Sequence, residues 1–296
     1  LATGKPRHLR ESRVPNGFDT LGSRLAFSPD GKQLVNVTTA GNLRFWDVAT
    51  GKRLRVAGDA VEPAPGELAV PVFAPPAGSV RLTKVWFPPD GKNVVAGTPD
   101  NVVVFVDPST GKTRRRFQLA GELASVATDG KTLAAIDAKR PEVILYNASG
   151  KELRRFRHEG TIDPVALTQG GKRLVTVNDK AEIKVWDAIT GKEQRTIAGP
   201  AAKSAARAPT VVSIAPDGNT LFAGTQGGDI LRWDLRNGKE QSTLRGHAWY
   251  VTGLFHAPDG RSLVSVSWDK VIHRWNLTTG KAEPTGEGYA NHIRVA

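Results

Sequence analysis

A two-residue marker recurs along this chain: a large apolar residue followed by an acid or an amide, with a Gly-Lys pair shortly after it. The intervals between successive markers are 60, 40, 40, 47 and 42 residues. A repeat of this length is one supersecondary unit, which buries its apolar face only against copies of itself. The repeat therefore constrains the fold more than any other feature. The six markers are Trp46-Asp47, Val106-Asp107, Tyr146-Asn147, Trp186-Asp187, Trp233-Asp234 and Trp275-Asn276.

Residues 210–281 contain the pattern twice in its clearest form. In each copy an alternating apolar run is followed by a Pro-Asp-Gly turn and a second run. A short Gly/Asp-rich turn and a third run then end in the marker and the Gly-Lys pair. Short alternating runs between Gly-containing turns are typical of β-strands joined by tight turns. The sequence therefore predicts four up-and-down strands per repeat.

A period near 40 residues with Trp-Asp endings resembles the WD-repeat family, whose members form β-propellers of four-stranded antiparallel blades. The resemblance covers nearly the whole chain and predicts an all-β propeller of six complete repeats. Residues 1–5 match the turn at 48–52, so we expect Pro6–Arg13 to be an outer strand. Residues 289–296 resemble the start of an inner strand. These two ends would form a split partial seventh repeat, so the sequence allows either six or seven blades. We expect residues 1–296 to be one domain cut from a longer protein.

Alternating strand direction places the Pro-Asp-Gly and Gly-Lys turns at one face of the propeller. The second-to-third turns and the connections between blades lie at the other face, where the long connections 58–79 and 199–209 also fall. Long irregular connections usually carry function. We expect a partner to bind this face, with the aromatic rings either serving as anchors or packing on one another, and with 58–79 either free or packed on a blade. The expected binding residues are Trp249, Tyr250, Trp268, Arg81, Leu68 and Phe73.

The sixth repeat holds His247, Ser265, Asp269 and Trp275. A Ser-His-Asp set suggests a hydrolase triad, but no oxyanion element or nucleophile turn accompanies it. The spacing is similar to the structural tetrad of WD repeats, in which four side chains hydrogen-bond in series. That resemblance implies a structural tetrad and no catalytic residues. The fourth repeat keeps Thr176, Asp179 and Trp186 but lacks the Gly-His pair, so we expect the clamp in one blade only.

The net charge is +12, and the basic residues follow the Gly-Lys turns, in the predicted outer strands. Charges on an outer strand block edge-to-edge pairing, which explains most of the excess without a partner. Nucleic acid or another polyanion is the alternative explanation. Gly111-Lys112-Thr113 resembles the end of a phosphate-binding loop. Such a loop needs a glycine five positions before Gly111, where this chain has Val106. The six His are scattered and Cys is absent, so no metal or cofactor is expected.

These patterns predict a non-catalytic scaffold that binds a protein or peptide partner on the face with the inter-blade connections. Binding of nucleic acid or another polyanion by the basic rim is one alternative, which steep salt dependence would indicate. A propeller enzyme with its site at the central channel is another, which convergent titrating groups would indicate. No apolar run approaches the ~20 residues of a membrane span, so no membrane partner is expected. The sequence names neither the partner nor the compartment.

Overall fold

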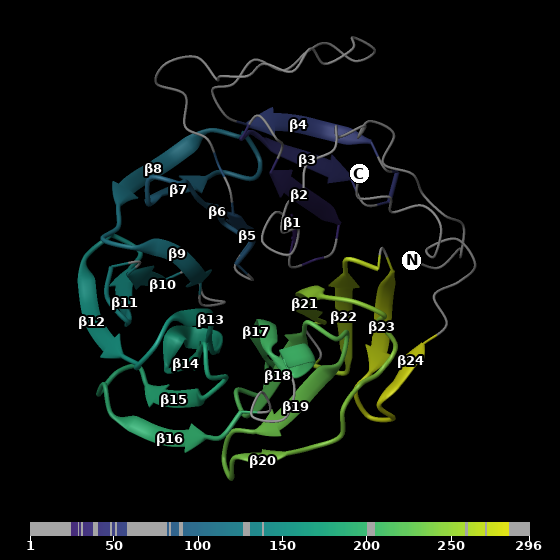
Figure 1. Cartoon of the computed structure of the whole chain (residues 1–296). Helices are drawn as coiled ribbons and strands as arrows, with labels where there is room; N and C mark the ends of the chain where they lie inside the picture. The colour runs from purple at the N-terminus through teal and green to yellow at the C-terminus, as the bar shows by residue number, and fades with distance from the viewer. Residues whose placement is uncertain are drawn as a thin grey trace.

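The chain folds into six antiparallel sheets of four strands each, arranged as blades around a central axis (Figure 1). In this computed structural model the described residues are 25–283, apart from 29, 31, 38–40, 48, 51, 58–81, 83, 89–90, 127–130, 138, 200–204, 258–259 and 270. The predicted all-β propeller is confirmed, and it has six blades. The expected strands at Pro6–Arg13 and 289–296, which would make the partial seventh repeat, lie outside the described residues.

The strands of the first three blades follow the chain in order. Blade 1 holds β1 (Leu25–Phe27), β2 (Gln33–Val37), β3 (Leu43–Asp47) and β4 (Arg53–Ala57). Blade 2 holds β5 (Lys84–Trp86), β6 (Val94–Gly97), β7 (Val102–Val106) and β8 (Thr113–Gln118). Blade 3 holds β9 (Glu122–Val126), β10 (Thr132–Asp137), β11 (Glu142–Asn147) and β12 (Glu152–Arg157).

The last three blades repeat this order. Blade 4 holds β13 (Ile162–Leu167), β14 (Arg173–Asn178), β15 (Ile183–Asp187) and β16 (Glu193–Ile197). Blade 5 holds β17 (Pro209–Ile214), β18 (Thr220–Thr225), β19 (Ile230–Asp234) and β20 (Lys239–Glu240). Blade 6 holds β21 (Val251–His256), β22 (Ser262–Ser267), β23 (Ile272–Asn276) and β24 (Lys281–Glu283). Within the described ranges, two short 3-10 helices, Gln169–Gly171 and Ala205–Arg207, interrupt the all-β pattern.

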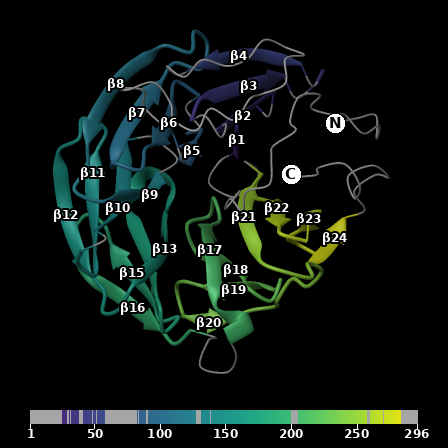
Figure 2. The same cartoon turned by 45° about the horizontal axis from the view of Figure 1, so that its top comes forward.

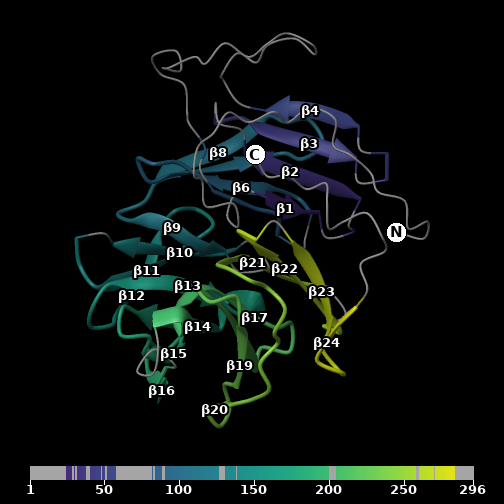
Figure 3. The same cartoon turned by 45° about the vertical axis from the view of Figure 1, so that its right-hand side comes forward.

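The first strand of every blade lies nearest the axis and the fourth lies at the rim, as Figures 1 and 2 show. Because the strands alternate in direction, the first-to-second and third-to-fourth turns share one face, which we call the turn face. The second-to-third turns and the connections between blades share the opposite face, which we call the connection face. Figure 3 shows the ring from a third direction.

The hydrophobic core lies in the seams between consecutive blades, with one buried cluster for each of the five seams described. The middle strands serve two seams at once, because successive side chains of a strand point to opposite faces of its sheet. In β6, Val94 packs toward blade 1 and Val95 packs toward blade 3, and both are fully buried. This explains why the second and third runs of each repeat are almost continuously apolar.

The markers fill these seams near the rim. Tyr146, Trp186, Trp233 and Trp275 each belong to the cluster shared with the preceding blade. Burying one large aromatic side chain per seam contributes roughly 1.5–3 kcal/mol each. The acid or amide that follows closes the next turn, as where Asp187 Oδ1 accepts the amides of Ile189 and Thr190. The marker therefore serves the seam with its first residue and the turn with its second.

Candidate binding face and its hydrogen-bond clamp

Three aromatic rings meet on the connection face of blade 6. Trp249 and Tyr250 belong to the connection that enters the blade, and Trp268 belongs to its second-to-third turn. Tyr250 stacks on Trp268 with 4.7 Å between ring centroids, and Trp249 meets Trp268 edge-on at 5.7 Å. We call these three residues the aromatic cluster. Two of them are half-buried, but Trp249 keeps 51% of its surface exposed.

Backbone contacts hold the aromatic cluster in place. The amide of Trp268 donates to the carbonyl of Tyr250 at 2.9 Å, and the hydroxyl of Ser267 donates to the carbonyl of Trp249 at 3.0 Å. Gly228 of the neighbouring blade 5 packs closely against the same segment. A Cβ atom at this position would lie 2.3 Å from the carbonyl oxygen of His247. Only glycine permits so close an approach at a positive φ of 90°. The rings are thus presented by a segment fixed on two sides.

A chain of buried hydrogen bonds lies beneath this segment. Nε1 of Trp275 donates to Oγ of Ser265 at 2.8 Å, and Oγ lies 2.7 Å from Nε2 of His247. Nδ1 of His247 lies 2.9 Å from Oδ2 of Asp269. A carboxylate only accepts, so the imidazole carries its proton on Nδ1 and accepts the Ser265 hydroxyl at Nε2. Every link then has one donor and one acceptor.

The electrostatics of this chain favour a neutral imidazole. Burial lowers the pKa of His247 even though the carboxylate of Asp269 opposes the shift. Burial alone would raise the pKa of Asp269, but the amides of Ala248 and Val271 donate to it and, with His247, lower that pKa. The bond from Ala248 attaches Asp269 directly to the segment that carries Trp249. These contacts support a structural interpretation of the tetrad.

The same geometry argues against a hydrolase triad. Ser265 is fully buried, and its oxygen already accepts the indole N–H of Trp275. A nucleophile needs a position about 3 Å away where a substrate carbon can sit. The tightly packed surroundings of Ser265 leave no such position.

A second chain of the same kind exists in blade 4, so the expectation that the clamp occurs in one blade only is wrong. Nε1 of Trp186 donates to Oγ1 of Thr176 at 3.0 Å, and Oγ1 lies 2.9 Å from Nδ1 of His158. The far ring nitrogen of His158 lies 3.1 Å from Glu182, which takes the place expected for Asp179. The sequence signal was missed because Arg157 stands where the Gly-His pattern has glycine.

The remaining residues expected in the partner site are Leu68, Phe73 and Arg81. They lie outside the described residues, as does the whole of the 58–79 connection. The described end of the 199–209 connection is fixed to blade 5, where the amide of Gly227 donates to the carbonyl of Ala206 at 2.7 Å. The described part of the chain has no cluster of three or more potential metal ligands. It also has no helix with the length and apolar character of a membrane span.

The connection face also has a cleft of about 380 Å³ between blades 2 and 3, lined by Asn101, Ala120, Asp137, Lys139, Arg140 and Arg155. The charge of Arg155 is compensated inside this cleft. Its guanidinium makes two hydrogen bonds to Glu152, at 2.8 and 2.9 Å, and a third to Glu142 at 3.3 Å. The ion pair with Glu152 raises the pKa of Arg155 further above its usual range. The two remaining basic side chains, Lys139 and Arg140, are exposed.

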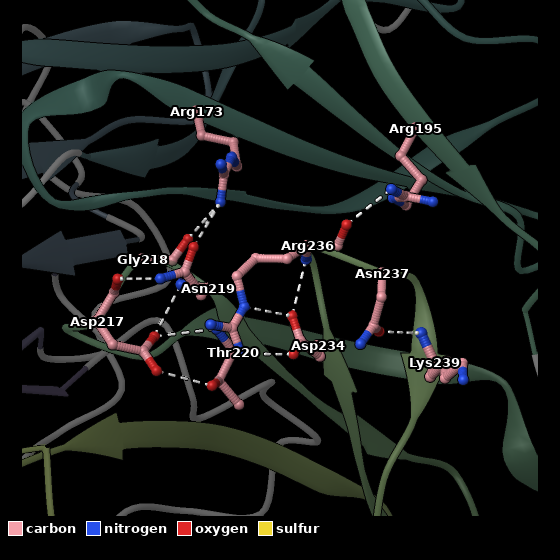
Figure 4. Close-up of polar contacts among 10 residues, drawn as sticks. All are labelled: Arg173, Arg195, Asp217, Gly218, Asn219, Thr220, Asp234, Arg236, Asn237 and Lys239. Atoms are coloured by element: carbon pink, nitrogen blue, oxygen red, sulfur yellow. Dashed lines mark hydrogen bonds and ion pairs between the residues drawn. The ribbon is translucent and has the colours of Figure 1, made fainter.

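Several arginines of the outer strands bind protein groups, which sequence reasoning did not predict. Nη2 of Arg195 in blade 4 donates to the carbonyl of Arg236 in blade 5 at 2.7 Å, and Arg154 in blade 3 donates to the carbonyl of Ile189 in blade 4 at 3.0 Å. Figure 4 shows Arg195 reaching across the seam, together with Arg173, whose Nη1 donates to the carbonyl of Gly218 at 2.6 Å. These arginines connect one blade to the turns of the next.

A second group of basic side chains is balanced within its own blade. Arg236 pairs with Asp234 through two hydrogen bonds, at 3.0 and 2.7 Å (Figure 4). The hydrogen bonds from Arg236 lower the pKa of Asp234 to about 2. Arg114 pairs with Asp107 at 2.5 Å, and the Arg115 guanidinium lies 4.6 Å from the centroid of the Phe105 ring. Much of the rim charge is therefore engaged in intramolecular contacts.

Comparison with known proteins agrees with this architecture. The family model described as WD domain, G-beta repeat matches residues 238–276, and the model described as outer membrane protein assembly factor BamB matches residues 99–247. Protein hir1 of Schizosaccharomyces pombe is 24% identical over 210 residues, and nuclear distribution protein nudF of Emericella nidulans is 23% identical over 213 residues. These alignments cover 62% and 63% of this chain but only 22% and 44% of the two relatives. The chain belongs to the WD-repeat β-propeller family, and residues 99–247 also match the BamB family model.

Proposed function

We propose that this propeller is a non-catalytic platform that binds a protein or peptide partner on its connection face. The observation that carries the proposal is the aromatic cluster, in which Trp249 keeps half of its surface exposed although its backbone is fixed. Trp and Tyr supply large contact areas with few rotamers to freeze, and they are enriched among the residues that dominate binding energy. A segment that is already fixed also loses little entropy when it docks.

The clamp supports this proposal because it couples the core of blade 6 to the binding segment. Asp269 accepts the amide of Ala248, directly before Trp249, while its other contacts lead through His247 to the buried Ser265. Preorganisation of this kind is how a rigid scaffold presents a recognition loop. In this proposal the polar tetrad positions the cluster and carries out no chemistry.

Binding of nucleic acid by the basic rim is the competing function. The rim arginines that bind carbonyls in the next blade or pair with carboxylates have less capacity to neutralise phosphates. Among the described residues, basic side chains also occur on the outer strand of every blade, so the charge is spread around the ring. These observations favour a protein partner over a polyanion.

Site-specific photo-crosslinking tests the proposal. A photoreactive amino acid is placed at Trp249, and in a matched variant at Asn237, an exposed-turn residue of blade 5 on the turn face. In cells that naturally express the protein, position 249 should give a discrete cross-linked protein band, and position 237 should not. Partner identity then comes from mass spectrometry and direct binding of the purified partner. Cross-links of equal yield at both positions, or cross-links only to nucleic acid, would contradict the proposal.

A further inference from the structure

The cleft between blades 2 and 3 has a rigid frame. Its walls come from the second-to-third turns of both blades, from the connection that joins the blades, and from β12. The amide of Leu119 in the connection donates to the carbonyl of Asn101 at 2.8 Å, and the amide of Ala120 donates to the hydroxyl of Tyr146 at 3.0 Å. The backbone that lines the cleft is thus held in place before a ligand arrives, which lowers the entropic cost of binding.

Three acidic side chains at the cleft are already engaged. Oδ1 of Asp137 accepts the backbone amide of Lys139 at 2.9 Å, and its Oδ2 lies 3.9 Å from Nη1 of Arg155. Glu142 and Glu152 bind the same guanidinium. These three carboxylates therefore gather around one arginine of β12 and around the backbone of the turn between β10 and β11. Their contacts fix that turn, which carries the other two basic side chains of the cleft.

Three polar side chains that line the cleft are available to a ligand. Among the residues that the structure describes, none makes a hydrogen bond or an ion pair with the ammonium of Lys139, the guanidinium of Arg140 or the side-chain amide of Asn101. Lys139 and Arg140 are exposed, and Asn101 is half-buried.

The chemistry of these three groups defines the ligand. Lysine and arginine side chains only donate hydrogen bonds, and the planar guanidinium of arginine matches the paired oxygens of a carboxylate or a phosphate. The amide of asparagine adds two further donors. A ligand in this cleft therefore has to offer oxygen acceptors that carry negative charge.

We propose that this cleft binds the carboxylate of an Asp or Glu side chain of the partner, with Lys139 and Arg140 as its cationic contacts and Asn101 as a further donor. The inference rests on the proposed function and adds a second contact on the connection face, across the ring from the aromatic cluster (Figure 1). The net charge of +12 attracts an acidic segment from a distance. A nucleic-acid strand fits less well, because two cations in a single cleft do not follow a phosphate backbone.

Short peptides of defined sequence test this inference before the partner itself is identified. The probes are acetylated pentapeptide amides of alanine whose central residue is Glu, Gln or phosphoserine. They are titrated at neutral pH and low salt into isotope-labelled protein and followed by the backbone amide signals of Asn101 and Ala120. Glutamine keeps the shape of glutamate without its charge. We expect the Glu peptide to bind about fivefold more tightly than the Gln peptide, as two exposed ion pairs allow.

The preference for Glu should disappear in the double variant Lys139→Gln, Arg140→Gln. The matched control is Lys151→Gln, Lys192→Gln, which removes two exposed positive charges from the turn face and should keep the preference. Both variants have the same net charge, so the comparison separates binding in the cleft from attraction by the whole protein. A well-dispersed amide spectrum of each variant shows that the fold is retained.

Four outcomes would overturn the inference. They are equal affinity for the Glu and Gln peptides, an unchanged preference in the cleft variant, an equal loss in both variants, and the absence of any shift at millimolar peptide. Binding of the phosphoserine peptide alone would assign the cleft to a phosphoryl group and reject the carboxylate.

These outcomes are separable from the proposed function. If the charge preference is absent but a cross-linked partner still depends on Trp249, the inference is wrong and the binding platform stands. If the charge preference is present but no partner depends on Trp249, the cleft binds carboxylates and the aromatic cluster is not the docking site.

Discussion

Nε2 of His247 lies 2.7 Å from Oγ of Ser265, and both atoms are sealed inside blade 6. The pair would resemble the reactive half of a hydrolase triad if the hydroxyl were accessible. Here the hydroxyl donates to the imidazole and accepts the indole N–H of Trp275, so its hydrogen-bonding capacity is used in linking three elements of the blade.

Removing the carboxylate at the outer end of this chain should destabilise the protein. Asp269→Ala leaves His247 and the amides of Ala248 and Val271 without their acceptor, at a cost of about 1–3 kcal/mol in the free energy of unfolding. Asp100→Ala, in the corresponding turn of blade 2, should change it by less than about 0.5 kcal/mol. Urea unfolding at neutral pH measures both. A Ser265→Ala variant that kept full stability but lost a measurable hydrolysis would overturn the structural interpretation.

Arginines that reach the next blade should contribute to stability, whereas free rim arginines should not. Arg195→Ala removes the hydrogen bond to the carbonyl of Arg236 and should lower the free energy of unfolding by about 0.5–1.5 kcal/mol. Arg116 is exposed on β8, and Arg116→Ala serves as the matched control. Thermal unfolding of the two variants provides the comparison. Equal midpoints would mean that the carbonyl bond across the seam contributes nothing measurable.

The basic rim should also protect the sheet edges. Replacing Arg114, Arg115 and Arg116 with Thr removes three charges from the edge strand of blade 2 and should increase aggregation, which light scattering at rising protein concentration measures. Partner affinity should stay the same, because this strand lies at the rim. Submicromolar binding of nucleic acid at physiological salt that disappears in the triple variant would instead favour the polyanion function.

His256 should make stability depend on pH. Both ring nitrogens are inaccessible and have no partner among the described residues, and burial lowers the pKa of His256 to about 4. Below pH ~6.5 the unfolded chain binds a proton that the folded chain does not, so stability falls as the pH drops toward the folded-state pKa. Between pH 7 and 5 the loss should be about 2 kcal/mol.

A substitution isolates this contribution. Leu167 and Ile214 occupy the corresponding positions of blades 4 and 5 in the sheet register. His256→Leu should therefore fold and lose the His256 part of the pH dependence, which urea unfolding of both proteins at several pH values measures. Identical pH profiles for the two proteins would show that the folded protein accommodates the protonated ring.

The sequence predicted the repeat and its blades because each turn needs Gly at a positive φ and each seam needs a large side chain, and both requirements recur in the residues themselves. It also located the tetrad of blade 6, where Gly246 precedes His247. It missed the equivalent chain at His158, because Arg157 and not glycine precedes that histidine, and because Glu182 supplies the carboxylate from a different place in the turn.

The central claim is that the connection face binds the partner through the aromatic cluster. The most direct test measures the dissociation constant of the cross-linked, purified partner for Trp249→Ser and for Ile189→Ser. Ile189 is 66% exposed in a third-to-fourth turn, so it is a matched exposed apolar residue on the turn face. Trp249→Ser should weaken binding about tenfold or more, a loss of at least about 1.4 kcal/mol, and Ile189→Ser should leave it unchanged. Unchanged affinity in Trp249→Ser, or an equal loss in both variants, would contradict the account.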